Sequence, residues 1–399
     1  MTHKFLAQRF SVRYAESLGS ITAKDWDACA NPRGPPDSVG ERYNPFVSHA
    51  FLRALETSKS VGGRTGWTPA HALVEDSLGR LVACAPAYIK THSLGEYVFD
   101  HNWARAYELA GGSYYPKIQV AVPFTPVAGR RLLIAKDAPD GAREALIVAL
   151  QGLRKASGAS SIHVTFCTED ERVALSGAAF VYRAGEQFHF VNEGYGDFED
   201  FLSRLTARKR KVIKRERREA LGDDIAIDLL TGADIRSEHW DSFFEFYMDT
   251  GARKWGSPYL TRAFFDEIGA RMPDRILLVM ARRGSRHIAG AINFLGDDAI
   301  YGRNWGAVEE VPFLHFEVCY YQAIEFAIRH GYKRVEAGAQ GEHKIARGYR
   351  PVITHSAHHF ADSRFAEAVS DYLAREREAV TDWAAEHTAE LPYKVENGG

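Results

Sequence analysis

Apolar residues along this chain recur with two periods, which together predict a mixed α/β protein. Helical spacing predicts a helix over 142–156 and another that begins at Glu309–Pro312 and ends at Gly331. Runs of β-forming residues predict strands over 117–124, 161–166, 298–305 and 333–337. A strand–loop–helix–strand order therefore occurs twice, and each copy is expected to be a right-handed crossover between parallel strands. The copies share little residue identity, so the repeat is architectural.

The remaining pattern predicts shorter elements between these two crossovers. Residues 1–45 are expected to be irregular, with a helix over 49–57 and paired strands over 67–74 and 81–90. The second half is expected to contain a hairpin of strands 276–281 and 288–295, preceded by two helices. The chain of 399 residues is long enough for two domains.

Composition narrows the class of protein. The hydrophobic fraction is 45%, the charged fraction 26% and the formal net charge −2, which predicts no global attraction to nucleic acid or membrane. The four cysteines, Cys29, Cys84, Cys167 and Cys319, are far apart and form no zinc or disulfide framework. No signal peptide or membrane-spanning run is found, so a cytoplasmic protein is expected. His355, His358 and His359 lack the spacing of metal ligands, and no metal site is expected.

One short segment departs from this neutral balance. Nine Lys or Arg residues fall between Arg204 and Arg218, against the single acid Glu216. One interpretation is a solvated helix that joins two domains, with its long side chains covering apolar surface. The other is an electrostatic site for phosphates, including the backbone of a tRNA. Both interpretations remain open from the sequence.

Three segments are similar to one family. They read YVFDHNWARAYELAGGSYYPKIQVAVPFTPVAGRRLL (97–133), HFEVCYYQAIEFA (315–327) and GAQGEHKIARGYRP (338–351). These segments resemble the FemAB-like family of predicted N-acyltransferases, and the resemblance extends from about Pro45 to about Glu376. It implies tandem GNAT-like domains, expected at 1–197 and 223–376, with a basic connecting helix at 198–222 and a tail at 377–399. It also implies acyl or aminoacyl transfer to an amine acceptor in a cleft between the domains.

The polar loop after the last core strand is the first candidate site, because open α/β sheets bind ligands at such strand ends. It contains Gln340, Glu342, His343, Lys344 and Arg347 among glycines. Glu342 is the expected general base, with His343 second, and Lys344 and Arg347 would neutralise an anionic group. The alternative is a surface loop whose charges pair with one another.

Neighbouring segments add candidates to this site. Tyr301, Arg303 and Trp305 alternate along a strand, so they are expected to share one face and bind substrate. His315 and Glu317 are further catalytic candidates, but they are two residues apart on a helix and cannot form a simple dyad. His315 and Cys319 share a helical face, although a packed cysteine is the more common arrangement.

The first half offers a second candidate site. Tyr115 and Lys117 precede Gly129, Arg130 and Arg131, a pattern that could receive the pyrophosphate of coenzyme A. A plain turn that exposes two arginines explains the same residues. In the second half, Glu309 and Glu310 at the expected helix start would repel such an anion.

Three hypotheses for function follow. The first is an N-acyltransferase for a small-molecule or peptide amine, with acyl-CoA or a carrier-bound acyl group as donor. The second is a Fem-type transferase that takes an aminoacyl group from tRNA held by the Arg204–Arg218 segment and passes it to a peptide or a cell-wall precursor, as in peptidoglycan biosynthesis. The third is a non-catalytic protein that binds a ligand. The sequence does not indicate an oligomeric state.

Overall fold

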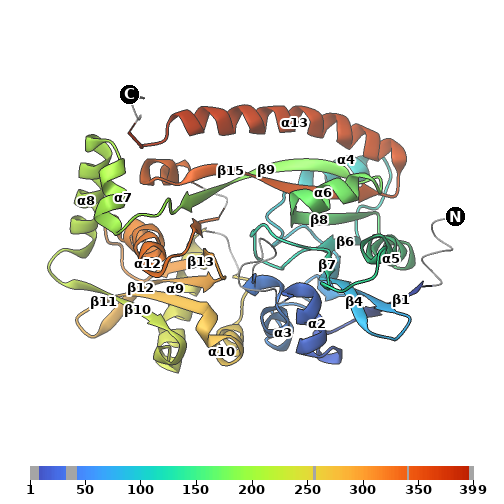
Figure 1. Cartoon of the computed structure of the whole chain (residues 1–399), viewed down its shortest axis with the longest axis horizontal. Coiled ribbons are helices and arrows are strands. Elements are labelled where there is room, and N and C mark those ends of the chain that lie inside the picture. The colour runs from blue at the N-terminus through green and yellow to red at the C-terminus, as the bar shows by residue number, and fades with distance from the viewer. Residues whose placement is uncertain (1–8, 33–42, 255–257, 339–340, 395–399) are drawn as a thin grey trace. The chain divides into compact units, whose positions relative to one another are not determined.

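The computed structural model describes residues 9–32, 43–254, 258–338 and 341–394. The chain forms two compact units (Figure 1). Unit 1 runs to Gly185 and takes in Thr354–Val380, and unit 2 comprises Glu186–Ile353 and the residues after Val380. Three elements pass from one unit to the other, namely β9 (Val181–Val191), β15 (Arg350–Phe360) and α13 (Ser363–Ala389). The segment 198–222, expected to connect two domains, therefore belongs to unit 2.

Unit 1 contains two sheets and a helical layer. The larger sheet has the order β15-β8-β6-β5-β2, and the smaller has the order β1-β3-β4-β7. Its strands are β1 (Phe10–Ala15), β2 (Trp67–Pro69), β3 (His71–Asp76), β4 (Leu81–Ala85), β5 (Ala87–Lys90), β6 (Lys117–Val120), β7 (Leu133–Ile134) and β8 (Ser161–Cys167). Its helices are α2 (Ala23–Ala30), α3 (His49–Thr57), α4 (His101–Leu109), α5 (Ala142–Ala156) and α6 (Glu169–Ser176). The expectation that residues 1–45 are irregular is wrong, because β1 pairs with β3 and Thr22 caps α2.

The two faces of the larger sheet in unit 1 differ in polarity. Ile118 and Val120 of β6 and Ile162 and Val164 of β8 pack in the apolar core under α5. The opposite face carries the row Tyr88, Gln119, His163 and His358 across four strands, and all four residues are buried. A buried polar face requires partners for its polar groups.

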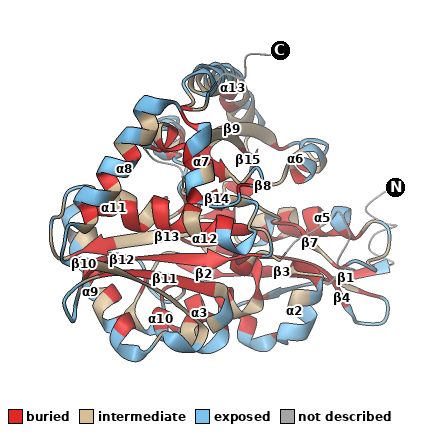
Figure 2. Ribbon diagram, turned by 60° about the vertical axis from the view of Figure 1, so that its left-hand side comes forward, coloured by how far each residue is buried: buried red, intermediate tan, exposed pale blue. Residues whose placement is uncertain are grey.

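Unit 2 has one sheet with helices on both faces. Its strands follow the order β10-β11-β12-β13-β14-β9. They comprise β10 (Ile225–Thr231), β11 (Ile276–Arg283), β12 (Arg286–Leu295), β13 (Ala299–Ala307), β14 (Arg334–Glu336) and β9. The helices are α7 (Phe198–Arg204), α8 (Ala207–Leu221), α9 (Ser237–Lys254), α10 (Arg262–Arg271), α11 (Leu314–Phe316) and α12 (Gln322–His330), with a π-helical segment at Glu317–Tyr321 between the last two. Figure 2 shows β11 and β12 almost wholly buried, with α12 over one face and α9 and α10 over the other.

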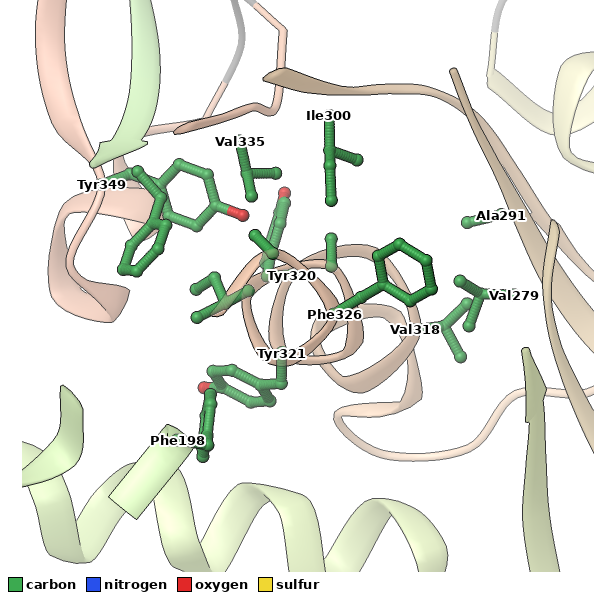
Figure 3. Packing of buried hydrophobic residues seen from close by; sticks show 14 of the residues in the cluster. Phe198, Val279, Ala291, Ile300, Val318, Tyr320, Tyr321, Phe326, Val335 and Tyr349 are labelled. Carbon is green, nitrogen blue, oxygen red and sulfur yellow. The ribbon is translucent and has the colours of Figure 1, made fainter. Parts of the chain in front are cut away.

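The core of unit 2 centres on α12. Its apolar face packs against Ile300 of β13, Val335 of β14 and Ala291 of β12. Figure 3 looks along this helix and shows Tyr321 and Phe198 together on the side of α7 and α8. Tyr320 lies on another side, where its ring contacts that of Tyr349 (centroids 5.6 Å apart). The helix that the sequence predicted is therefore the main packing element of this unit.

Both units contain the predicted crossover between parallel strands. In unit 1 β6 pairs in parallel with β8, and in unit 2 β13 pairs in parallel with β14. The parallel pairing in unit 2 is short, from Ala299–Arg334 to Tyr301–Glu336. Beyond it β13 continues to Ala307, and no strand in the described residues pairs with the edge that β14 leaves. The predicted mixed α/β fold, with a parallel crossover in each half of the chain, is confirmed.

Candidate functional site

The loop after β14 presents His343 at the surface of unit 2. Residues Glu342–Arg347 form a 3₁₀ helix between two glycines with positive φ, Gly341 (101°) and Gly348 (88°). A Cβ atom on Gly341 would lie 2.3 Å from the His343 ring. Only glycine therefore allows the backbone and this imidazole to lie so close together. Among the predicted catalytic residues, His343 is the exposed one whose side chain the structure describes.

His343 is paired with a tyrosine that comes from the π-helical segment. The distance from Tyr320 Oη to His343 Nε2 is 3.0 Å, and Tyr320 is 5% exposed. Burial lowers the pKa of His343, and the nearby charges of Arg347 and Lys344 lower it further. The imidazole is therefore neutral at pH 7 and can accept a proton. Burial raises the pKa of Tyr320, so this phenol keeps its proton and can donate it.

Aromatic side chains surround the His343–Tyr320 pair. His315 lies against Trp305 (ring centroids 5.2 Å apart), Tyr320 (5.3 Å) and His343 (6.2 Å). The ring of Phe316 lies 5.4 Å from that of His343. His315 and Tyr320 are five residues apart, and the wider π-helical turn brings such residues together. The structure thus assembles Trp305, His315 and His343, which the sequence predicted, with Tyr320 and Phe316, which it did not.

The two cations of the loop are not free to meet a ligand. Lys344 is 2% exposed, donates to the carbonyl of Gly338 (3.0 Å) and has its pKa lowered to about 8 by burial. Arg347 is 6% exposed and donates to the carbonyl of His343 (2.7 Å). Its guanidinium also lies 3.4 Å from the centre of the Phe316 ring. Arg347 therefore holds the backbone of His343 in place.

Buried ion pairs attach the basic helix α8 to this loop. Glu216 of α8 accepts from Arg347 (2.8 and 2.9 Å) and from the hydroxyl of Tyr321. On the next residue of α8, Arg217 donates to Glu317 (2.9 Å) and to Glu325 (2.9 Å). Glu317 is fully buried and points toward α8. Its carboxylate is held in this buried ion pair and is not placed to contact a ligand.

The three predicted residues on β13 do not share a face. The register of β13 shifts by one residue at Arg303, since Gly302 pairs with Asn293 whereas Asn304 pairs with Ile292. The bulge shifts the alternation by one residue, so Trp305 faces α12 and Tyr301 faces the opposite side. Tyr301 is 3% exposed and accepts from Arg334 (3.4 Å). The expectation of one face is therefore wrong, and Trp305 alone of the three is shown against His315.

The helix expected to begin at Glu309 begins later. Its first residue is Leu314, and Phe313 precedes it with a φ of 61°. Glu309 lies before it and forms ion pairs with Arg283 and Arg286. The prediction that Glu309 and Glu310 lie in the first turn of the helix is therefore wrong. Residues 308–313, which precede that turn, nevertheless contain no cation. Gln340 and the side chain of Glu342, the expected base, lie outside the described residues.

The first-half candidates Tyr115 and Lys117 belong to a closed ionic cluster in unit 1. Lys117 is fully buried and donates to Glu96 (2.7 Å), Asp100 and Ser93 (2.8 Å). The hydroxyls of Tyr115 and Ser93 lie 2.8 Å apart. The pKa of Lys117 is raised, because Glu96 and Asp100 outweigh the effect of burial. This lysine therefore stays charged between two carboxylates.

A second lysine of this cluster lies beside Glu96. Lys90 is fully buried, with Nζ 3.7 Å from the centre of the Trp67 ring and 3.6 Å from Glu96. Burial lowers the pKa of Lys90 to about 7. Among the buried side-chain atoms of unit 1 that lack a hydrogen-bond partner within the described residues are Glu96 Oε1, Asp100 Oδ1, Tyr88 Oη, Gln119 Oε1 and His358 Nε2. The four charged side chains of the cluster, those of Lys90, Lys117, Glu96 and Asp100, are all 5% exposed or less.

Arg130 and Arg131 are used inside unit 1. Arg131 is 1% exposed and donates to the carbonyls of Val127 (2.6 Å) and Thr165 (3.0 Å). Arg130 donates to the carbonyls of Cys29 (3.1 Å) and Ala30 (2.6 Å). Both guanidinium groups hold loops together, so they are not placed to receive a pyrophosphate. Neither Arg130 nor Arg131 is therefore a candidate for ligand binding.

Several of these partners could not be predicted from local sequence patterns. Tyr320 fits the apolar face of a helix, and its contact with His343 depends on the π-helical turn. Glu216 appeared as one acid in a basic run, and its single occurrence was the available signal. In the described part of the chain, no group of three or more His, Cys, Asp or Glu residues could hold a metal ion. No helix there is long and apolar enough to cross a membrane.

A family model, FemAB-like, described as peptidoglycan biosynthesis/recognition, matches residues 17–395. The structure is similar to FemX, with 12% identity, a TM-score of 0.51, and coverage of 88% of this chain and 98% of that one. It is also similar to the C-terminal domain of a putative lysylphosphatidylglycerol synthetase from Agrobacterium fabrum (9% identity, TM-score 0.53, 88% and 95% covered).

A third similar structure is a conserved protein of unknown function from Bacteroides thetaiotaomicron, with 11% identity, a TM-score of 0.53, and coverage of 88% of this chain and 100% of that one. At these identities the likeness shows the fold alone. A search of curated proteins found no match to the sequence.

Proposed function

Since the chain belongs to the FemAB-like family, we propose that it transfers an acyl or aminoacyl group to an amine, with His343 of unit 2 as the general base. The contact between His343 and Tyr320, at 3.0 Å, carries this proposal. It places a neutral imidazole beside a protonated phenol on the loop that follows β14. Such a pair can accept one proton and donate another in the same reaction.

Two parts of unit 2 take part in the reaction: the His343–Tyr320 pair transfers protons, and the edge of β13 binds the carbonyl oxygen. The amine nitrogen of the acceptor bonds to the donor's carbonyl carbon, and the bond from that carbon to the leaving oxygen or sulfur breaks. The His343–Tyr320 pair takes the proton from the amine and returns one to the leaving atom. The edge of β13 that β14 leaves after Glu336 supports binding of the carbonyl oxygen, because free amide N–H groups stabilise a developing negative charge.

We further propose that the donor is an aminoacyl-tRNA. Five cations of α8 have no ion pair among the residues that the structure describes: Arg208, Lys209, Arg210, Lys211 and Arg218. They form a phosphate-binding surface on α8. The same helix is attached to the loop of His343 through Glu216 and to the π-helical segment through Arg217. Acyl-CoA is the second candidate. The residues 308–313 ahead of α11 offer no cation for its pyrophosphate, which disfavours it.

The acceptor that we propose is a primary amine of a peptide or a cell-wall precursor. The family description, peptidoglycan biosynthesis/recognition, supports this class. A ligand-recognition protein without catalysis is the remaining alternative. The two are separated by turnover, because recognition alone releases no labelled product.

The donor is tested by measuring transfer of a radiolabelled group to a panel of peptide and amino-sugar amines. One arm supplies a mixed pool of aminoacyl-tRNAs, and the other supplies acetyl-CoA. We expect labelled product in the first arm. Product from acetyl-CoA alone would overturn the tRNA proposal and keep the acyltransferase, and tight binding of an acceptor without product in either arm would favour recognition.

The role of α8 has its own binding test. We expect the double variant Arg208→Glu/Lys211→Glu to weaken binding of tRNA about 10-fold or more in filter binding at 50 mM salt, since about two phosphate contacts are lost. The matched control is Lys24→Glu/Lys333→Glu, which makes the same change of charge at two exposed lysines elsewhere. Equal losses in both double variants would mean that net charge, and not α8, determines binding.

A further inference from the structure

Unit 1 contains a cavity that no part of the proposed function uses. Its volume is ≈ 1110 Å³, and its walls come from β1, α3, the loop of residues 58–66, β2, β5 and α5. Val61, Ile89 and Leu153 form an apolar wall. Arg53, Lys59 and Arg64 supply three cations to the same lining. All of these residues belong to unit 1, so the cavity is complete without unit 2.

The loop of residues 58–66 is held in one conformation. Gly62 donates its N–H to the carbonyl of Trp67 (2.8 Å), and Thr65 donates to the carbonyl of Gly62 through its hydroxyl (2.9 Å). His92 Nε2 contacts the carbonyl of Thr65 (2.9 Å). Gly66 has a φ of 74°, and a Cβ atom there would lie 2.1 Å from the ring of His92. These hydrogen bonds hold the loop in one conformation. Gly66 is required there, because a side chain at this position would clash with His92.

Some donors of this loop, on Lys59, Gly63 and Arg64, have no partner among the described residues. Lys59 and Arg64 are exposed, and neither has an ion pair among the described residues. Within the same set of residues, the amide N–H groups of Gly63 and Arg64 have no acceptor. Gly63 and Arg64 both line the cavity. Two adjacent amides together with two cationic side chains are the donors that bind an oxyanion in proteins.

The carboxylates of the lining do not cancel these charges. Glu56 accepts from Ser17 (2.7 Å), Leu18 (3.0 Å) and the buried His71 (3.0 Å), and Arg53 forms an ion pair with it (3.1 Å). Burial raises the pKa of Glu56, but the bonds from His71, Ser17 and Leu18 outweigh it, so the pKa lies below its usual range. The other carboxylate, Glu16, is exposed. Lys59 and Arg64 are thus left as cations available to a ligand.

We propose that this cavity is a second ligand site, which binds an organic anion: a phosphate or carboxylate group carried on a small apolar body. Arg64, Lys59 and the two free amides hold the anionic group. Val61, Ile89 and Leu153 contact the apolar body and exclude water from it. The size of the cavity fits a small molecule and not a polymer. The proposal does not rest on the transferase activity of unit 2.

The site is tested with probes that share one body and differ in charge. Phenyl phosphate, benzoate and uncharged benzyl alcohol are titrated into the full-length protein, and binding is followed by saturation-transfer NMR. We expect one or both anions to bind at least 10-fold more tightly than benzyl alcohol. The stronger of the two identifies the source of the charge as phosphate or carboxylate. Equal binding of the alcohol, or no binding of either anion, would overturn the proposal.

Two matched double variants locate the binding. Lys59→Glu/Arg64→Glu should reduce affinity for the bound anion at least 10-fold. The control, Lys136→Glu/Arg143→Glu, makes the same change of charge at exposed cations of unit 1 that do not line the cavity, and it should leave affinity unchanged. Equal loss in both would overturn the site. Thermal unfolding of both variants verifies that they fold, since all four residues are exposed.

Discussion

The two units each contain a cluster of ionisable side chains, and the clusters differ in access to solvent. In unit 1, Lys117, Lys90, Glu96 and Asp100 are all 5% exposed or less, and the two carboxylates share Lys117. In unit 2, Arg347, Glu216 and Glu317 are equally buried, but His343 above them is exposed. Unit 1 therefore pairs these buried charges with one another. Unit 2 uses its buried charges to hold a reactive side chain at the surface.

This difference separates charges that stabilise from charges that act. A closed cluster can orient nothing outside itself, and its members are costly to remove because the remaining charges stay buried. An open pair such as His343–Tyr320 contributes less to stability and is placed to exchange protons with a ligand. Strong perturbation of pKa values occurs in both units, so perturbation alone does not distinguish them. Access does.

The largest expected effect on stability comes from the closed cluster. Lys117→Met removes the ammonium group between Glu96 and Asp100 and leaves two carboxylates buried side by side. We expect the unfolding free energy of unit 1 to fall by about 4–5 kcal/mol, the upper range for breaking a buried ion pair. Urea unfolding followed by tryptophan fluorescence measures it, with the exposed Lys136→Met as control. A loss below about 1 kcal/mol would show that the cluster is not stabilising.

A smaller loss is expected at the link between α8 and the loop of His343. Glu216→Gln leaves Arg347 buried without a counter-charge, which should cost unit 2 about 3 kcal/mol. Glu219→Gln on the same helix removes an exposed carboxylate and should cost less than about 0.5 kcal/mol. Denaturant titration of both variants compares them directly. Equal effects would mean that Glu216 has no special role in holding the loop.

Acid should destabilise unit 1 through its buried histidines. Burial lowers the pKa of His163 to about 3, whereas the unfolded chain binds this proton near pH 6.5. Between those values the unfolded state holds more protons, so stability falls as pH falls, by about 1.4 kcal/mol per pH unit for this residue. The slope of unfolding free energy between pH 6.5 and 5 should become shallower in His163→Gln. An unchanged slope in that variant would contradict it.

Patterns of the sequence predicted much of the fold. The helix at 142–156 matches α5 residue for residue, and the paired strands around the crossovers lie within a few residues of the predicted bounds. These elements have a strong period, and the period is a local property. The strand β1 was missed because it is short and its middle residues, from Ser11 to Tyr14, are exposed on the sheet. The length of α13 was missed because most of its residues face solvent.

The candidate site could be predicted only in part. His343, Trp305 and His315 were identified from their positions and lie together. Tyr301 was placed on the wrong face, because one extra residue at Arg303 shifts the alternation and no sequence signal marks that bulge. Glu317 looked catalytic as an acid on a helix, yet Arg217 holds it in the interior. Contacts between residues about a hundred positions apart depend on packing, which local patterns do not contain.

The most direct test of the account is the single-turnover rate of aminoacyl transfer by His343→Ala. With a mixed pool of aminoacyl-tRNAs and an amine acceptor, we predict a rate about 10²–10⁴-fold below that of the unaltered protein, the usual contribution of a general base. His330→Ala, at an exposed histidine of α12, should transfer at the unaltered rate. Thermal unfolding of both variants should be unchanged. A His343→Ala protein that transfers as fast as its control would contradict the assignment of the site.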